Sequence, residues 1–291
     1  MRNGRNPLTR SLQVLRHLVQ SPTDSVGVRT IALALKMAPS TMHRVLSSLV
    51  EEGLVSRRSD GTYALGLEMV RLSYLAVERL PIQKLAIPHL RQLVSVTNET
   101  ALLGLYDRAR QEMMFVASAE SSQPLRYVNK MRTWMPVYAG ASGLSIMAFL
   151  PDSEREQIIE RTHLAPLTNH TVTERYKLDD LLEQVRQTGY SCTIGQRTPG
   201  AVAVGAPVFG PSGDVAGDII ITLPEQRFDR SSEPHLAAHV MRCAQAVTRE
   251  FGGVPPFDFP GVKDPRIDVT VAAAETRKSR AAGVSPRVSR R

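Results

Sequence analysis

Residues 38–63, "APSTMHRVLSSLVEEGLVSRRSDGTY", decide how the first part of the chain folds. Pro39 suits the first turn of a helix, where its missing N–H is no loss, and Gly53 suits the position just past a helix end. Between them, apolar side chains recur at helical spacing and form one stripe. The stripe predicts a short helix that packs inward and leaves its polar side outside. It consists of Met42, Val45, Leu46 and Leu49.

A β-hairpin is predicted directly after this helix. Its strands are residues 54–58 and 63–65, and Asp60-Gly61 in the turn is a dipeptide typical of tight hairpins. Upstream, residues 8–19 repeat apolar side chains at helical spacing, and residues 30–36 predict a second short helix. Three helices followed by a hairpin predict a winged helix-turn-helix.

The polar side of the third helix is a candidate DNA-reading surface. Short or fork-shaped donors and acceptors can read the major groove, and arginine can bind guanine bidentately. Arginines on a hairpin suit the phosphates or the flanking minor groove. The alternative is an ordinary solvated helix face and turn, since polar helix faces usually serve solvation. The predicted DNA-binding residues are Ser40, Thr41, His43, Arg44 and Ser47 on the helix, with Arg57 and Arg58 on the hairpin.

Net charge is +8 over 291 residues and is unevenly distributed. Residues 1–66 carry +5 and residues 253–291 carry +4, whereas the middle of the chain sits at −1. A basic front and a basic tail favour a polyanion partner, which here means double-stranded DNA.

Cysteine usage and hydropathy predict a cytoplasmic protein that does not bind membranes. Two cysteines, Cys192 and Cys243, make no disulfide framework for a chain of this size and fit a reducing compartment. The charged N-terminus is followed by no apolar segment of the kind a secretory signal needs. No apolar run approaches the ~20 residues of a membrane span.

The rest of the chain predicts a linker helix and an α+β domain. Turn residues between several apolar segments favour antiparallel pairing. Strands are predicted at residues 100–107, 111–120, 125–131, 202–210 and 214–223, and helices at residues 81–97, 142–149, 152–161, 178–188 and 230–250. The predicted segments are a DNA-binding domain (1–66), a linker helix (67–81), an effector-binding domain (82–252) and a disordered basic tail (253–291), the last because it is rich in Pro and Gly and has no period.

The stretches "SLQVLRHL" and "VRTIALALKMAPSTMHRVLSSLVEEGLVSRRSDGTYALG" resemble the N-terminal domain of the bacterial IclR family of transcriptional regulators. The resemblance continues in "MPVYAGASGLSIMAFLP", "RQTGYSCTIGQRTPGAVAVGAPVF" and "GDVAGDIIITLP", and it spans residues 8–251. It implies a winged helix-turn-helix, a linker helix and a GAF-like effector domain built on an antiparallel sheet with flanking helices. It also implies a homodimer or homotetramer on a palindromic promoter site, which fits the few contacts that one winged helix offers.

The segment "VYAGASG" before an apolar helix predicts a binding site for a carboxylate. Free N–H groups and the helix dipole both favour an anion at a helix start. The plainer interpretation is that Gly140 and Gly143 only permit a tight turn and close packing. In the family, this loop and residues of three strands surround a small organic acid. Carried over to this chain, the effector-binding residues are Gly140, Ala141, Ser142, Thr193, Ala203, Ile220 and Thr222.

Several of these positions depart from the family's pattern. Leu144 stands where a lysine is usual, and residues 193–196, with Arg197 close by, replace a stretch that is often acidic. Ala203 replaces a cysteine, and Ile220 and Thr222 replace serines. These changes make the predicted pocket more apolar. We therefore expect an apolar or aromatic carboxylate, held by the loop amides and Thr222.

The sequence predicts a ligand-responsive regulator of a catabolic operon rather than an enzyme, with no catalytic residue and no cofactor. Three alternatives stay open. Ser142 and Ser145 loosely resemble a nucleophile turn, but no His and Asp are placed to complete a triad. His235, His239 and Cys243 at i, i+4 and i+8 suit a metal-responsive regulator, although the apolar stripe of that helix places Cys243 on the core side. An architectural DNA-binding protein without a ligand is the third.

Overall fold

The computed structural model describes residues 6–79 and 81–256, and its contacts divide the chain into two compact units between residues 80 and 81. The predicted tail lies outside the described residues from residue 257 onward. The finer division at residues 66, 81 and 252 stays a prediction.

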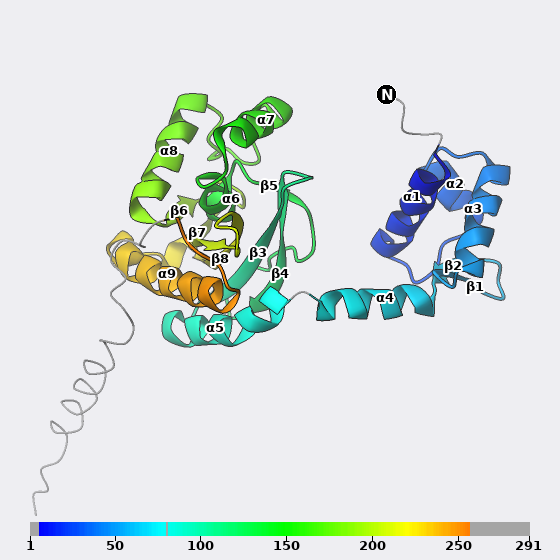
Figure 1. The fold of residues 1–291 in the computed structure, drawn as a ribbon, viewed down its shortest axis with the longest axis horizontal. Helices are drawn as coiled ribbons and strands as arrows, with labels where there is room; N and C mark the ends of the chain where they lie inside the picture. The colour runs from blue at the N-terminus through cyan, green and yellow to red at the C-terminus, as the bar shows by residue number, and fades with distance from the viewer. Residues whose placement is uncertain (1–5, 80, 257–291) are drawn as a thin grey trace, which may run out of the picture. The chain divides into compact units, whose positions relative to one another are not determined.

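Four helices and a hairpin form the first unit, and the order of its elements is that of a winged helix-turn-helix (Figure 1). The predicted stripe of the third helix is buried throughout and packs against Val14 and Leu18 of the first helix. This packing fixes which side of the third helix faces outward. The elements are α1 (Pro7–Gln20), α2 (Val28–Ala34), α3 (Pro39–Glu51), β1 (Val55–Arg57), β2 (Tyr63–Leu65) and α4 (Leu67–Glu78).

The hairpin turn is held by Asp60, as the Asp-Gly pair predicts. Its carboxylate accepts hydrogen bonds from the amide and the hydroxyl of Thr62, at 2.9 and 2.6 Å, and Gly61 supplies the positive φ of +80°. Tyr63 also exchanges two backbone hydrogen bonds with Val26, at 2.8 and 2.9 Å. The sequence did not predict this additional pairing with β2, because only one residue, Val26, takes part in it.

The second unit is an α+β domain around one antiparallel sheet of six strands, in the order β5-β4-β3-β8-β7-β6. The long central strands β7 and β8 are almost wholly buried because helices cover both faces of the sheet. The strands are β3 (Thr100–Asp107), β4 (Glu112–Ala119), β5 (Met135–Pro136), β6 (Ser191–Ile194), β7 (Ala201–Phe209) and β8 (Val215–Pro224).

Helices α5 and α9 cover one face of the sheet, and α6 covers the other (Figure 1). All eight residues of α6 are buried, which explains why its sequence carries no charge and has only small or apolar side chains. No helix of the described residues is long and apolar enough to cross a membrane. The helices are α5 (Pro81–Thr97), α6 (Gly140–Met147), α7 (Asp152–Thr162), α8 (Arg175–Thr188) and α9 (Glu233–Glu250).

One predicted strand is wrong, because residues 125–131 form a coil that makes only an isolated bridge between Met131 and Phe115. Side chains along this coil alternate in burial. Tyr127 and Asn129 are half-buried, whereas Val128 between them is 89% exposed. The alternation that suggested a strand therefore reflects a coil lying across a surface, without a paired ladder. Conversely, the short strands β5 and β6 were not predicted.

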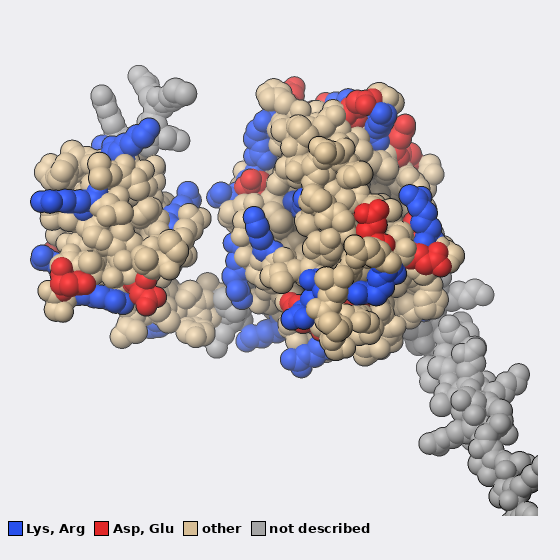
Figure 2. All heavy atoms as spheres, turned by 180° about the vertical axis from the view of Figure 1, so that it is seen from behind, with Lys and Arg blue, Asp and Glu red and all other residues tan. Residues whose placement is uncertain are grey.

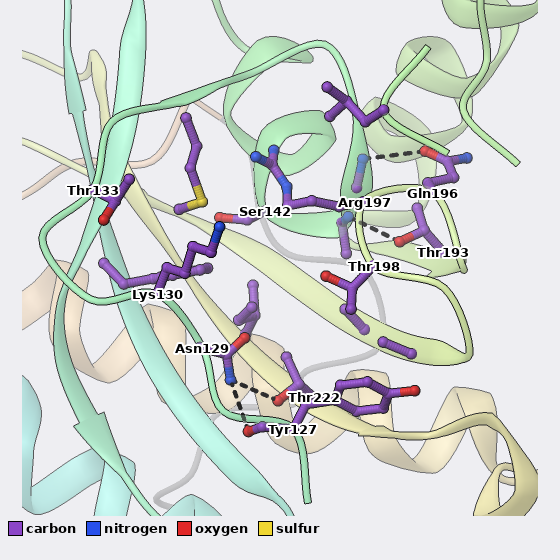
Figure 3. Close-up of a pocket in the computed structure, with 18 of the residues that line it drawn as sticks. Tyr127, Asn129, Lys130, Thr133, Ser142, Thr193, Gln196, Arg197, Thr198 and Thr222 are labelled. Carbon is purple, nitrogen blue, oxygen red and sulfur yellow. Dashed lines mark hydrogen bonds between the residues drawn. The ribbon is translucent and has the colours of Figure 1, made fainter. Parts of the chain in front are cut away.

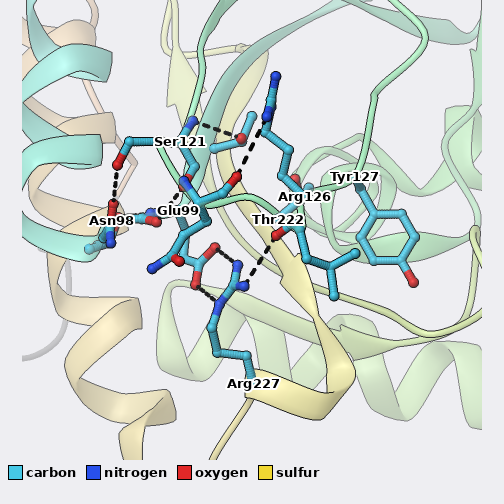
Figure 4. A network of polar contacts seen from close by, with 12 residues as sticks. Asn98, Glu99, Ser121, Arg126, Tyr127, Thr222 and Arg227 are labelled. Atoms are coloured by element: carbon cyan, nitrogen blue, oxygen red, sulfur yellow. Dashed lines mark hydrogen bonds and ion pairs between the residues drawn. The ribbon is translucent and has the colours of Figure 1, made fainter.

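A partly buried ion pair anchors the start of this coil (Figure 4). Nε and Nη2 of Arg227 donate to the two carboxylate oxygens of Glu99, at 2.7 and 2.6 Å, while Nη1 donates to the carbonyl of Leu125 at 3.2 Å. The Ser121 hydroxyl donates to the carbonyl of Asn98 at 2.6 Å. The coil is thus fixed at its beginning to the chain segments at the start of β3 and after β8.

Candidate functional site

The first unit presents the predicted DNA-binding side chains to solvent. Of the helix residues only Thr41 is half-buried; Ser40, His43, Arg44 and Ser47 are exposed, as are Arg57 and Arg58 of the hairpin. On the side of this unit that Figure 2 shows, basic side chains lie among acidic ones and do not gather in one block. That the exposed polar side of α3 contacts DNA stays a prediction.

A cavity of about 500 Å³ opens on the α6 side of the sheet in the second unit (Figure 3). Its floor comes from β7 and β8, whose register sets Ala203 opposite Thr222. The start of α6 and the loop after β6 form one wall, and the coil of residues 127–136 forms the other. All seven predicted effector-binding residues line it, namely Gly140, Ala141, Ser142, Thr193, Ala203, Ile220 and Thr222. That they bind an effector stays a prediction.

Two of the three loop amides are already hydrogen-bonded by neutral side chains. The Gly140 N–H donates to Oε1 of Gln196 at 3.2 Å, and the Ala141 N–H donates to the hydroxyl of Thr193 at 2.9 Å. A carboxylate that uses these amides must displace the two side chains. The Ser142 amide makes no hydrogen bond to a side chain among the described residues, and the Ser142 hydroxyl makes a long contact, 3.9 Å, to the sulfur of Met113.

The backbone structure also requires glycine at both positions of this loop, Gly140 and Gly143. Gly140 has φ +74°, in the left-handed region that glycine tolerates best. A Cβ on Gly143 would lie 2.5 Å from the carbonyl oxygen of Val137, so the helix start approaches that backbone more closely than any other residue allows. The plainer interpretation of this segment is thus compatible with a binding role.

The lining of the cavity carries two cations, Lys130 and Arg197, and no acid among the described residues. Arg197 donates from Nη2 to the carbonyl of Pro136 at 2.7 Å and to the carbonyl of Ala139. Burial lowers the pKa of Arg197 to about 10, against the opposing effect of Asp218, so the guanidinium stays charged at neutral pH. Figure 3 shows both cations extending toward the end of the cavity where Ser142 lies. This end is therefore electropositive.

The outer wall is aromatic and comes from the coil that was wrongly predicted as a strand. Tyr127 donates to the carbonyl of Pro199 at 3.0 Å, and the Asn129 amide donates to the hydroxyl of Thr222 at 3.2 Å. Trp134, the single tryptophan of the chain, lies further along it, with the Arg110 guanidinium 4.7 Å from its ring. A lone tryptophan in a polar segment was the sequence signal that could have found this wall.

The candidate metal ligands do not assemble a metal site. The rings of His235 and His239 pack edge to face, 4.6 Å apart, while Cys243 is buried in the core. Arg242 bonds to Nδ1 of His239 at 2.7 Å, and burial together with this cation lowers the pKa of His239 to about 4. No group of three or more His, Cys, Asp or Glu side chains in the described part of the chain could hold a metal ion.

Ser145, the second serine of the suspected nucleophile turn, serves packing. Ser145 is fully buried, and its hydroxyl lies 2.7 Å from that of Ser191, which in turn bonds to the carbonyl of Ala141. These bonds hold α6 against β6. A buried hydroxyl in such a chain is not exposed to a substrate.

Comparison with known proteins matches both units to one family. The IclR helix-turn-helix domain matches residues 7–59, and the bacterial transcriptional regulator IclR C-terminal domain matches residues 74–249. The chain is similar to the HTH-type transcriptional regulator KipR of Bacillus subtilis, with 31% identity over 87% of this chain and 99% of the relative. It is also similar to the glycerol operon regulatory protein of Streptomyces griseus, with 30% identity over 84% and 96%.

Solved structures share the fold. The IclR of Thermotoga maritima aligns with a TM-score of 0.67 and 26% identity, over 84% of this chain and 98% of that one. An IclR homologue from Microbacterium hydrocarbonoxydans, crystallised with 4-hydroxybenzoate, aligns with a TM-score of 0.73 and 21% identity, over 84% and 99%.

The capping role of Thr193 can be tested by replacing its hydroxyl with a methyl group. Thr193→Val leaves the buried Ala141 N–H without an acceptor, so the free energy of unfolding of the second unit should fall by about 1–3 kcal/mol. Thr198→Val, at an exposed position on the same cavity, is the matched control and should change it little. Equal effects of the two variants in urea unfolding would show that the cap does not stabilise α6.

Proposed function

Because the chain belongs to the IclR family of bacterial transcriptional regulators, we propose that it binds a palindromic promoter site as a dimer or tetramer and senses an apolar or aromatic carboxylate. The relatives named above are regulators and not enzymes, and the two matched domains are a DNA-binding domain and an effector-binding domain. The observation that carries the effector half is a cavity whose lining combines two cations with aromatic rings and lacks acids.

The size and chemistry of this cavity support a compact ring with one negative charge. A volume of about 500 Å³ lies within the range of small-molecule sites. Phe115, Tyr127 and Trp134 provide flat apolar surface, while Arg197 and Ser142 form the polar end. In place of serines, β8 contributes Ile220 and Thr222, so the floor offers one hydroxyl, which removes part of the hydrogen bonding that a very small polar acid would need.

The DNA half rests on the geometry of α3. Its buried stripe holds the helix against the core, so Ser40 and Arg44 project from a rigid base. Arg57 and Arg58 stand on the adjacent wing, where charge strengthens binding regardless of sequence. One winged helix gives few contacts, which supports a symmetric assembly on two half-sites.

The two halves act as one regulator if the effector binds two arrangements of the assembly with different affinity. We propose that the acid shifts the geometry of the dimer, or its pairing into a tetramer, and so changes the match to the half-site spacing. The corresponding biological role is control of a catabolic operon that encodes a pathway with this acid as its substrate or intermediate.

A panel of acids tests the effector class. Benzoate and 4-hydroxybenzoate should bind more tightly than glyoxylate and pyruvate, because only the aromatic acids fill the apolar wall. Calorimetry gives the affinities, and fluorescence of Trp134, the only tryptophan, reports occupancy of the cavity itself. Tight binding of glyoxylate or pyruvate, with none of the aromatic acids, would contradict the proposal.

Arg44→Ala tests the DNA-reading face. Loss of a bidentate base contact should weaken binding to the specific site by about 1–3 kcal/mol and affect random DNA much less. Arg16→Ala, an exposed arginine on α1, is the control for loss of charge in the same unit. Mobility shifts with the upstream region of the gene and with scrambled DNA provide the comparison. An equal loss on both DNAs would assign Arg44 to phosphate contact.

A further inference from the structure

A buried acid lies directly behind the cavity, and the proposed function does not use it. Asp218 of β8 is 0% exposed, and neither oxygen of its carboxylate has a hydrogen-bond partner of good geometry within the described residues. Side chains alternate along a strand, so Asp218 shares its face with Ile220 and Thr222, which form the cavity floor. The carboxylate therefore lies just beyond the inner end of the cavity.

The elements packed against Asp218 bring one charge to it. On the neighbouring strands, Gly104 and Pro207 stand opposite Asp218 in the register, and neither titrates. A Cβ on Gly104 would lie 2.1 Å from Oδ1 of Asp218 and 2.5 Å from the Met113 side chain, so this glycine makes room for the acid. Of the groups that line the cavity, the Ser142 hydroxyl and the Arg197 guanidinium act on the carboxylate.

Arg197 compensates Asp218 through space and not by direct contact. Its Nη2 group bonds to the carbonyls of Pro136 and Ala139 instead. Lys130, the other cation of the cavity, is exposed, where solvent and salt screen its charge. The counterion of the buried acid is thus also the cation that the proposed effector would meet.

A carboxylate that loses its counterion in a buried place takes up a proton, because the charged form is far more costly there than the neutral one. Burial already raises the pKa of Asp218 to about 7, with smaller opposing effects of Ser142 and Arg197. Asp218 is therefore ionised above neutral pH and protonated below it. A second anion beside Arg197 raises this pKa further.

Building on the anionic effector of the proposed function, we propose that the effector and Asp218 compete for the Arg197 guanidinium. The anion therefore binds together with one proton from solvent, which the Asp218 carboxyl takes up. Before binding, and leaving aside the exposed Lys130, the site holds the Arg197 cation and the Asp218 anion. After binding it holds the Arg197 cation, the effector anion and a neutral acid, so its net charge is unchanged.

The consequence is a pH-dependent sensor. Above pH 7, where Asp218 is ionised without effector, each further pH unit should weaken effector binding about tenfold. Below pH 6 the acid is already protonated, so the affinity should level off. By reciprocity, effector binding strengthens proton binding to Asp218 by the same factor by which protonation strengthens effector binding.

Calorimetry tests the linkage on the full chain with benzoate, 4-hydroxybenzoate and pyruvate, at pH 6, 7 and 8. Titrations in phosphate and in Tris, which differ in ionisation enthalpy, yield the number of protons taken up. We expect a value near one at pH 8, falling toward zero at pH 6. Asp218→Asn should abolish the uptake and bind about tenfold more tightly than wild type at pH 8. Asp180→Asn, at an exposed position on α8, should behave as wild type.

A ligand-free measurement separates the titration of Asp218 from the effector class. A raised folded-state pKa costs the wild type stability progressively as the pH rises from about 4 to 7, with no further loss above. The gain in melting temperature of Asp218→Asn over wild type should therefore be larger at pH 8 than at pH 5.

An acid that binds wild type with no proton uptake and the same affinity at all three pH values overturns the linkage and leaves the proposed effector class intact. Equal melting-temperature differences at pH 5 and pH 8 likewise overturn it. If none of the three acids binds, the proposed effector class fails, and the linkage that depends on it fails too.

Discussion

The charge of Arg197, held between a loop and the start of α6, is the constraint on which the cavity depends. Its guanidinium joins the carbonyls of Pro136 and Ala139, and its side chain lies against Gly140, where a Cβ would come within 3.1 Å of Nε. One side chain thus connects β5, the first turn of α6 and the loop after β6. The same side chain makes the inner end of the cavity electropositive, so structure and binding chemistry share one residue.

The aromatic wall is held more strongly at its two ends than over the cavity. The coil begins at the Glu99–Arg227 ion pair, a bidentate contact on a carboxylate that is 7% exposed. Over the cavity, Tyr127 and Asn129 hold it by single hydrogen bonds, each worth about 1 kcal/mol. Further along, the coil is paired again, at the Met131–Phe115 bridge and in β5 with β4. The segment around Tyr127 and Asn129 is therefore the most lightly held part of the wall.

Local patterns predicted the elements whose sequence carries their own boundaries. Pro39, Gly53 and the apolar stripe defined α3 closely, and the Asp-Gly turn located the wing. The helix-start pattern predicted Gly140, Ala141 and Ser142, whereas the cavity residues of the strands came from the family resemblance. The antiparallel register sets Thr193, Ala203 and Thr222 side by side. The aromatic wall was missed because the alternation of a coil across a surface matches that of a strand. The side-chain caps on Gly140 and Ala141, and the pairing of Arg197 with Asp218, join residues 20 or more positions apart, which no local pattern records.

The central claim is that an anion in the cavity controls DNA binding, and one titration tests it most directly. The affinity of the full chain for its own upstream region is measured with and without a saturating concentration of an acid that binds the cavity, in wild type and in Arg197→Met. The account predicts a change of about 5- to 150-fold in wild type and none in the variant. Unchanged DNA affinity in wild type, with the cavity shown to be occupied, would contradict it.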